Sequence, residues 1–440
     1  MASKVLCGFL LLSSFLVLLS SGCPSECKCP RDKKVVCSDM LITNVPSGIP
    51  EDTEILELSQ CDIKNISMDS FKNLSNLIAI EIKEQKSGLN LQDAAIFQGL
   101  EKLQRVYLDG NGIVSLPEDL FANLSSLETV HLNDNPLTTL PDDLFQNSPN
   151  LKFLSLVNTK LSKEVLAKIG QGTFAANIEA LSLQGTPIQN LLSNFFSGLK
   201  NLKILVLRNC QINYIREDVL KGTKVTSIDF GENPIKTIDV NAFRGINSPA
   251  GISLKFPKCN LTTATIQNIP VLDSLFLENN KISHIPKDAF KNLKNLHLIK
   301  LSNNLIETIE ENPFAKLPKC SDALCPQLDG NPLNCDCNLA WLHKWTENWD
   351  DLARKSLKCT KPEKVAGKNF AELKPSQFCC LNGTKCGNMT PTTTTMTTTI
   401  MTTAKTTGNR TNEAMIIASH FITVTTHLIF LQLIFFLILP

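Results

Sequence analysis

The sequence predicts an α/β solenoid, in which short repeats each add one strand to a single parallel sheet. Two observations lead to this prediction. An apolar phrase returns at intervals of about 24 residues across most of the 440-residue chain. Cysteine clusters flank this repetitive region, at 23–37 on one side and 335–386 on the other. A stack of repeats exposes apolar interior at both ends, so we expect these clusters to form disulfide-linked caps.

The repeated phrase is L-x-x-L-x-L-x-x-N-x-L, the leucine-rich repeat. Clear copies are "LQRVYLDGNGI" at 103–113, "LETVHLNDNPL" at 127–137, "LDSLFLENNKI" at 272–282 and "LHLIKLSNNLI" at 296–306. With the weaker copies, about 11–12 repeats fill residues 53–333. The predicted fold is therefore a leucine-rich repeat horseshoe with a parallel sheet on its concave face.

The chemistry of the phrase assigns a role to each position. Alternation sends the leucines of the L-x-L segment inward from a short strand. The asparagine also turns inward, where its amide can bond buried backbone groups. Cys61, Cys210 and Cys259 occupy this position in their copies, so we interpret them as buried free thiols and not as disulfides or nucleophiles. A recurring phenylalanine is expected in the core near the convex side, at Phe121, Phe145, Phe243 and Phe290.

The N-terminal segment, residues 1–22, is typical of a secretory signal peptide. Lys4 precedes the apolar run "VLCGFLLLSSFLVLLSSG", whose length and flanks fit a membrane helix poorly. The sixteen cysteines of the chain also favour an oxidising compartment. We therefore expect an extracellular protein.

The C-terminal segment, residues 413–440, is apolar and no Lys or Arg follows it. This favours a glycolipid (GPI) anchor signal over an ordinary spanning helix, with Gly408, Asn409 and Asn412 as candidate attachment sites. The threonine-rich segment 389–412 is expected to be an O-glycosylated stalk, with a plain disordered linker as the alternative. The predicted location is the cell surface, with the plasma membrane contacted through the lipid anchor.

Composition and motifs argue against catalysis and nucleic-acid binding. The net charge is +1, so there is no strong field to attract nucleic acid. G-x-S-x-G, H-E-x-x-H and a phosphate-binding glycine loop are all absent from the sequence. Clustered cysteines could bind zinc, but the oxidising compartment and the lack of histidine at ligand spacing favour disulfides. We expect no enzyme activity, no metal and no cofactor.

Seven N-x-S/T sequons provide possible N-glycan sites. Five are candidates: Asn65, Asn73, Asn123, Asn382 and Asn388. Asn260 adjoins a buried position, and anchor processing can remove Asn409, so we expect no glycan at either.

The predicted binding surface is the concave sheet face, whose residues alternate with the inward leucines. Phe153, Val157, Ala180, Ile204 and Val206 form an apolar area over neighbouring repeats. The candidate ligand contacts are this area and its polar rim: Tyr107, His131, Phe153, Val157, Ile204, Val206, Arg208 and Asp229. The alternative is that these are strand-forming residues tolerated on a sheet face or covered by a loop.

The cysteine clusters, "CPSECKCPRDKKVVC" and "NPLNCDCNLAWLHKW" with the cysteines after it, resemble the caps of extracellular leucine-rich repeat proteins. They place an N-terminal cap at 23–52 and a C-terminal cap at 334–388. The resemblance implies bonds Cys23–Cys29, Cys27–Cys37 and Cys335–Cys359. It also implies Cys337 with Cys379 or Cys380, and the remaining one of these two with Cys386. Cys320 and Cys325 lie in an insert of the last full repeat and are expected to pair locally.

Signal peptide, capped repeats, threonine-rich stalk and anchor tail together resemble the variable lymphocyte receptors of jawless vertebrates. This resemblance implies an immune recognition receptor that binds protein or glycan ligands through its concave face. The copies here vary in length from 21 to 27 residues, which departs from the uniform copies of that family. An adhesion or guidance molecule that binds another surface protein is the alternative. The ligand and the oligomeric state stay open.

Overall fold

The computed structural model describes residues 22–378, except 32, 172–173, 265, 267–268, 270, 316 and 318–325. The described residues form two compact units, one made of 22–131 and 141–150 and the other of 132–140 and 151–378. Nearly all of the predicted signal peptide, the stalk and the anchor tail lie outside the described residues. So do several predicted site residues: Cys320, Cys325, Cys379, Cys380, Cys386, Asn382 and Asn388.

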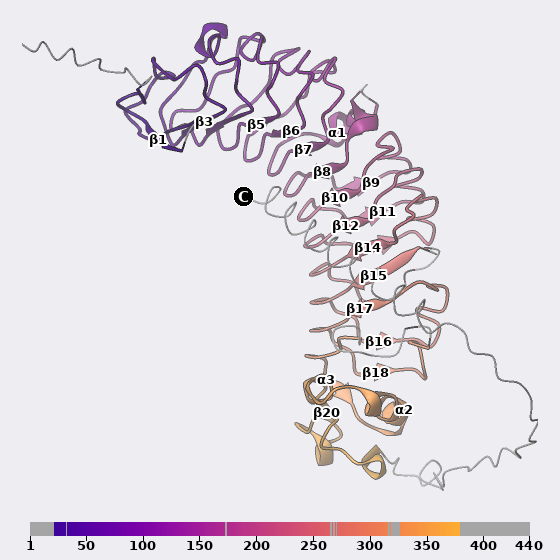
Figure 1. Cartoon of the computed structure of the whole chain (residues 1–440). Coiled ribbons are helices and arrows are strands. Elements are labelled where there is room, and N and C mark those ends of the chain that lie inside the picture. The colour runs from indigo at the N-terminus through magenta and orange to yellow at the C-terminus, as the bar shows by residue number, and fades with distance from the viewer. Residues whose placement is uncertain are drawn as a thin grey trace, which may run out of the picture. The chain divides into compact units, whose positions relative to one another are not determined.

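The first unit is a sheet with one strand per repeat, drawn in indigo and violet in Figure 1. A hairpin begins it, because β1 runs antiparallel to β2. From β2 to β6 all pairs are parallel and in register. The strands are β1 (Lys28–Arg31), β2 (Lys34–Cys37), β3 (Ile55–Ser59), β4 (Ala79–Lys83), β5 (Arg105–Tyr107) and β6 (Thr129–His131), and a short 3₁₀ helix η1 spans Met68–Ser70.

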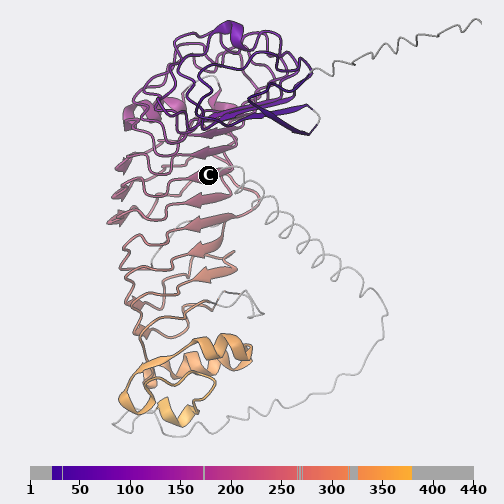
Figure 2. The same ribbon diagram turned by 90° about the vertical axis from the view of Figure 1, so that its left-hand side faces the viewer.

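The second unit continues the same plan, and Figure 2 shows its strands as a stack of arrows with the same direction. Its main sheet contains β7 (Phe153–Ser155), β8 (Ala180–Ser182), β10 (Ile204–Val206), β12 (Ser227–Asp229), β14 (Ile252–Lys255), β15 (Leu272–Phe276) and β17 (Leu298–Lys300). Smaller parallel sheets join β9 (Asn190–Leu191), β11 (Tyr214–Ile215) and β13 (Thr237–Ile238), β16 (His284–Ile285) and β18 (Thr308–Ile309), and β19 (Leu333–Asn334) and β20 (Cys359–Lys361).

Helices are few and short in the described part of this unit. They are α1 (Lys163–Ile169), α2 (Ala340–Trp345) and α3 (Asp351–Ser356), with 3₁₀ turns η2 (Ala175–Asn177), η4 (Cys337–Leu339), η5 (Thr346–Asn348), η6 (Glu363–Val365) and η7 (Pro375–Phe378). Within the described ranges, no helix is long and apolar enough to cross a bilayer.

Alternation along each strand builds the core. In β3, Leu56 and Leu58 are fully buried, while Ile55 and Glu57 are half-buried on the other face. The same alternation buries Val106, Val130 and Leu154 in their strands. The turns that follow carry stacked phenylalanines, and Phe71, Phe97, Phe121 and Phe145 form a continuous series with centroid distances of 5.4–6.3 Å. The predicted parallel leucine-rich repeat solenoid is confirmed, and so are the buried phenylalanines.

Inward asparagines link successive turns of the chain. The Asn233 amide donates to the carbonyls of Leu207 and Phe230 at 2.6 and 2.7 Å. Its Oδ1 atom accepts from the backbone N–H groups of Cys210 and Ile212, at 2.8 and 3.0 Å. Asn280 and Asn304 make equivalent contacts in later repeats. One side chain thus satisfies four buried backbone groups that water cannot reach.

Three thiols replace asparagine at this position, as predicted. Cys61, Cys210 and Cys259 are free and fully buried. Their Sγ atoms donate to the carbonyls of Cys37, Leu183 and Phe230, at 3.3, 3.0 and 3.0 Å. Burial raises the pKa of all three thiols, to about 12 for Cys210 and Cys259.

These thiols should resist alkylation in the folded protein. With a pKa of about 12, only about one Cys210 or Cys259 thiol in ten thousand is ionised at pH 8, and the thiolate is the reactive form. Iodoacetamide at pH 8, followed by mass spectrometry, should leave all three unmodified. Denatured, unreduced protein is the control and should label at all three. Native labelling at the rate of an exposed thiol would contradict their burial.

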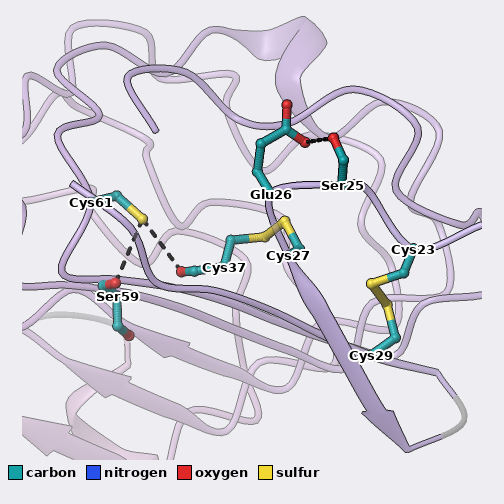
Figure 3. The surroundings of a disulfide bond; sticks show 8 residues. All are labelled: Cys23, Ser25, Glu26, Cys27, Cys29, Cys37, Ser59 and Cys61. Carbon is teal, nitrogen blue, oxygen red and sulfur yellow. Dashed lines mark hydrogen bonds between the residues drawn. A yellow bond between two sulfur atoms is a disulfide. The ribbon is translucent and has the colours of Figure 1, made fainter. Parts of the chain in front are cut away.

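The first unit begins with a disulfide-linked cap (Figure 3). Cys23 is bonded to Cys29, and Cys27 to Cys37. Since Cys37 ends β2, the second bond ties the N-terminal segment to the first parallel strand of the sheet. The cap thereby covers the first turn, whose core residue Val35 is buried.

The second unit ends in a cap that contains α2 and α3 (Figure 2). Cys335 is bonded to Cys359, and Cys337 is also in a disulfide, whose partner is outside the described residues. Trp345 stacks on Phe314 with a centroid distance of 5.5 Å, and the indole N–H of Trp341 donates to the Ile309 carbonyl. Both tryptophans therefore cover the end of the core.

One repeat departs from the common turn. Residues 151–177 hold the helix α1, where the sequence predicts only an irregular, 27-residue copy. Gly170 follows this helix and meets Gly198 of the next repeat. A Cβ atom on Gly198 would lie 1.5 Å from the Gly170 carbonyl oxygen, so the two backbones approach as closely as glycine allows.

Candidate functional site

Strand register places the residues between the inward leucines in rows on one face, which we call the strand face of each unit. In the second unit, Ile204 lies between Ala180 and Ser227, and Val206 lies between Ser182 and Asp229. The pairs continue with Lys255, Phe276 and Lys300. Neighbouring strands are about 4.8 Å apart, so side chains in one row touch.

Four apolar side chains meet on this face, and we call them the apolar cluster. They are Ala180, Ile204 and Val206, with Phe153 packed against them. Ile204 and Val206 are only 9% and 8% exposed, which is less than an open patch would show. The close spacing of the strands explains this low exposure, since each side chain shields its neighbours from solvent. Phe153, at the margin, stays half-buried.

Val157, which the sequence analysis placed in the same area, is buried. It is 2% exposed, and its backbone N–H donates to Asn133 Oδ1 at 2.9 Å. The residue follows the end of β7, where the chain already turns away from the face. The structure therefore gives Val157 no accessible surface for a ligand.

Arg208 is held at the edge of the apolar cluster by two carboxylates. Its guanidinium donates to Asp229 at 3.3 Å and to Glu232 at 2.6 Å. Burial acts to lower the Arg208 pKa, but the two negative charges outweigh it and the pKa is raised. Gly231 makes room for this arrangement, because a Cβ there would lie 2.7 Å from Arg208 Nη1 and 2.9 Å from Pro257.

Tyr107 and His131 lie in the first unit and form a cluster of their own. Their rings meet edge to face with centroids 4.7 Å apart, and Lys83 Nζ lies 4.6 Å from the Tyr107 ring. Burial, with a smaller contribution from Lys83, lowers the His131 pKa to about 4. This histidine is therefore neutral at physiological pH.

Three further strand-face residues of the second unit were not among the predicted contacts: Lys255, Phe276 and Lys300. Lys255 and Lys300 place their Nζ atoms 5.7 and 5.2 Å from the Phe276 ring. Lys255 follows the inward Leu254 in "ISLKF", so the alternation of this strand could have placed Lys255 on the strand face. The sequence analysis missed it because this copy of the repeat is short and weak.

The predicted glycan sites Asn65, Asn73 and Asn123 are exposed, and occupancy stays a prediction. Asn260 is exposed too, although it adjoins the buried Cys259, so burial is no reason to exclude it. In the described residues, no cluster of three or more His, Cys, Asp or Glu side chains could hold a metal ion.

The repeats and their fold define the class: the chain is a leucine-rich repeat protein. The leucine rich repeat family matches residues 101–161 and 270–321, and the BspA type leucine rich repeat region matches 153–250.

Among its relatives are a Toll-like receptor and an FLRT protein. Toll-like receptor 7 of Mus musculus is 25% identical over 333 residues, 66% of this chain and 29% of that one. The leucine-rich repeat transmembrane protein FLRT2 of Mus musculus is 26% identical over 384 residues, 82% of this chain and 49% of that one. Osteomodulin of Rattus norvegicus is 27% identical over 67% of this chain and 51% of its own length. This chain spans about half or less of the length of these relatives.

Two solved complexes contain chains with the same fold. A chain of the Toll–Spatzle complex of Drosophila superposes with a TM-score of 0.56 at 19% identity, over 79% of this chain and 55% of that one. A chain from the complex of Latrophilin 3, Unc5D and FLRT2 gives 0.55 at 22% identity, over 80% of this chain and 98% of that one. At these identities the likeness concerns the fold alone.

Proposed function

We propose that this protein is a cell-surface recognition receptor that binds a protein ligand through the strand face of its second unit. The observation that carries the proposal is the apolar cluster on a sheet face, bordered by the fixed charges of Arg208 and Asp229. An apolar centre with a charged rim is the usual anatomy of a protein-binding surface.

The relatives support this proposal by their class. One is a receptor of the Toll-like group, and FLRT2 occurs in a complex with Latrophilin 3 and Unc5D. We further propose a role in immune recognition, binding of glycans, and membrane attachment through the stalk and a GPI anchor. We also propose the C-terminal pairing of Cys337 with Cys379 or Cys380.

Adhesion to another surface protein is the second candidate function. The FLRT2 match favours it, since that alignment spans 82% of this chain. Sequencing the transcript from many single cells of one animal would distinguish these functions. Strand-face residues that vary between cells would indicate a diversified immune receptor, and one constant sequence would favour a single defined partner.

Val206→Asp should weaken ligand binding. The change puts a carboxylate into the apolar cluster and beside Asp229, its register partner. We expect a loss of about 2 kcal/mol or more, roughly thirtyfold in affinity, as for a central interface residue. The measurement is binding of multimerised extracellular proteins to cells that display the full chain.

Val240→Asp is the matched control, since Val240 is 51% exposed and follows β13, away from the strand face. It should bind normally. Phe153→Ala provides a second, half-buried position if Val206→Asp lowers surface display. Unchanged binding by a normally displayed Val206→Asp protein would refute the proposed site.

A further inference from the structure

The C-terminal cap contains a strongly basic stretch of chain. Residues 354–368 hold six Lys or Arg residues and one acidic residue, Glu363, so their net charge is +5. The whole chain has a net charge of +1, so all other residues together carry −4. The stretch runs from α3 through β20 to just beyond η6, in the orange cap of Figure 1. It creates a local positive field that the overall composition conceals.

The fold closes this stretch into a loop. The backbone N–H of Cys359 donates to the Lys368 carbonyl at 2.9 Å, and the N–H of Gly367 donates to the Cys359 carbonyl at 2.8 Å. Cys359 is also bonded to Cys335. Val365, between the two arms of the loop, is 1% exposed. The arms are therefore fixed side by side on the cap.

Three lysines of this loop are exposed, and we call them the cap lysines: Lys358, Lys364 and Lys368. Within the described residues they take part in no ion pair, whereas the neighbouring Lys355 and Lys361 each pair with a carboxylate. The positive charges of the cap lysines are thus held on an ordered backbone and face water. They are available to an anionic ligand.

Several lysines with few carboxylates among them suit a polyanion that carries many fixed charges. Each ammonium group is a point charge that can pair with sulfate or phosphate oxygens. Basic clusters of this kind are typical of heparin or nucleic-acid contacts. The disulfide that anchors the loop favours an oxidising, extracellular location, and hence a sulfated glycan over nucleic acid.

An anionic membrane surface fits the loop less well. Interfacial membrane sites combine basic residues with several large apolar side chains that enter the lipid. The described part of the cap exposes one such side chain, Leu352, which lies in α3 and is 80% exposed. Residues 354–368 expose none.

We propose that the cap lysines bind the sulfate groups of a sulfated polysaccharide. This inference rests on the glycan binding proposed above, to which it gives a class of ligand and a place. The site uses no residue of the strand face. It therefore adds a second contact surface whose chemistry is electrostatic.

The test measures capture of biotinylated heparin by cells that display the full chain and make no glycosaminoglycans of their own. Binding should weaken steeply as the NaCl concentration rises, because exposed charges are screened. Lys358→Gln/Lys364→Gln/Lys368→Gln should lower the heparin affinity roughly tenfold or more, because three charge-assisted contacts are lost. Unchanged affinity of this triple variant overturns the inference.

Two matched variants separate the site from net charge and from misfolding. Lys236→Gln/Lys281→Gln/Lys294→Gln removes the same charge from exposed lysines of the repeats and should leave the heparin affinity unchanged. Replacing the three cap lysines by arginine keeps the charge and should retain binding. An equal loss in the repeat variant would show that net charge alone governs binding, and it too overturns the inference.

Other probes identify the ligand class. Heparin from which the sulfate groups have been removed should not be captured, and equal capture would refute sulfate recognition. Vesicles that contain phosphatidylserine are the membrane probe. Their capture in place of heparin would make the loop a membrane contact and the proposed ligand wrong.

The two proposals fail in different ways. Val206→Asp should leave heparin capture unchanged, because Val206 lies on the strand face, and a loss there would place the polysaccharide on that face instead. If the triple glutamine variant captures heparin normally while Val206→Asp loses binding of extracellular proteins, the cap site is wrong and the strand-face site stands. If heparin capture depends on the cap lysines while Val206→Asp binds proteins normally, the reverse holds.

Discussion

Replacing Asn233 with alanine should cost about 4 kcal/mol of stability. The change leaves the backbone N–H groups of Cys210 and Ile212 without an acceptor in a dry interior, at roughly 1–3 kcal/mol each. It also removes the donors to Leu207 and Phe230. The side chain is 1% exposed, so water has little access to take over these bonds.

Hydrogen exchange is the suitable measurement, because a stack of repeats need not unfold in one step. Peptides that contain Cys210 and Ile212 should lose most of their amide protection in Asn233→Ala. Asn201→Ala is the matched control, since that amide makes only solvent-exposed bonds, one to the Ala176 carbonyl and one from Lys224 Nζ. It should cost less than about 1 kcal/mol. Unchanged protection at Cys210 would show that the asparagine does not carry these bonds.

Gly198→Ala should destabilise the repeat that contains α1, by about 3 kcal/mol. The new methyl group would lie 1.5 Å from the Gly170 carbonyl oxygen, which is backbone and cannot rotate away. One of the two turns must move, and overpacking of this kind costs roughly 1–3 kcal/mol or more. Exchange of the α1 amides and a lower thermal midpoint would report the change.

The partner glycine is the control. A Cβ on Gly170 would sit 3.7 Å from its nearest neighbours, an ordinary contact, and the residue has an αR conformation with φ of −72°. Gly170→Ala should therefore be nearly neutral. Equal stability of the two variants would mean that the close approach of these backbones is absent in solution.

The repeat phrase predicted the features that depend on local alternation. Leu56, Phe121 and Cys210 are buried where the phrase puts them, because each position has one orientation relative to its strand. Helix α1 was not predicted, since its segment is too short to show a helical period.

The candidate site was harder to predict because it depends on neighbouring repeats. Val157 continues the alternation of β7 in sequence, yet it is 2% exposed since the strand has already ended. The low exposure of Ile204 comes from neighbours in the apolar cluster that only register brings together. Lys255 escaped notice because its copy of the phrase is weak.

The inward position also determines how the second unit would respond to force. Its first complete repeats carry Thr159, Thr186 and Cys210 there, whereas the later repeats carry Asn233, Asn280, Asn304 and Asn331, with Cys259 as the one exception among them. Thr159 and Thr186 bond each other at 2.9 Å, and Cys210 offers one weak sulfur donor. An asparagine fastens four backbone groups, so tension along the solenoid axis is borne by fewer bonds in the early repeats. Under tension, we expect the repeats that carry Thr159, Thr186 and Cys210 to extend before the asparagine-linked repeats do.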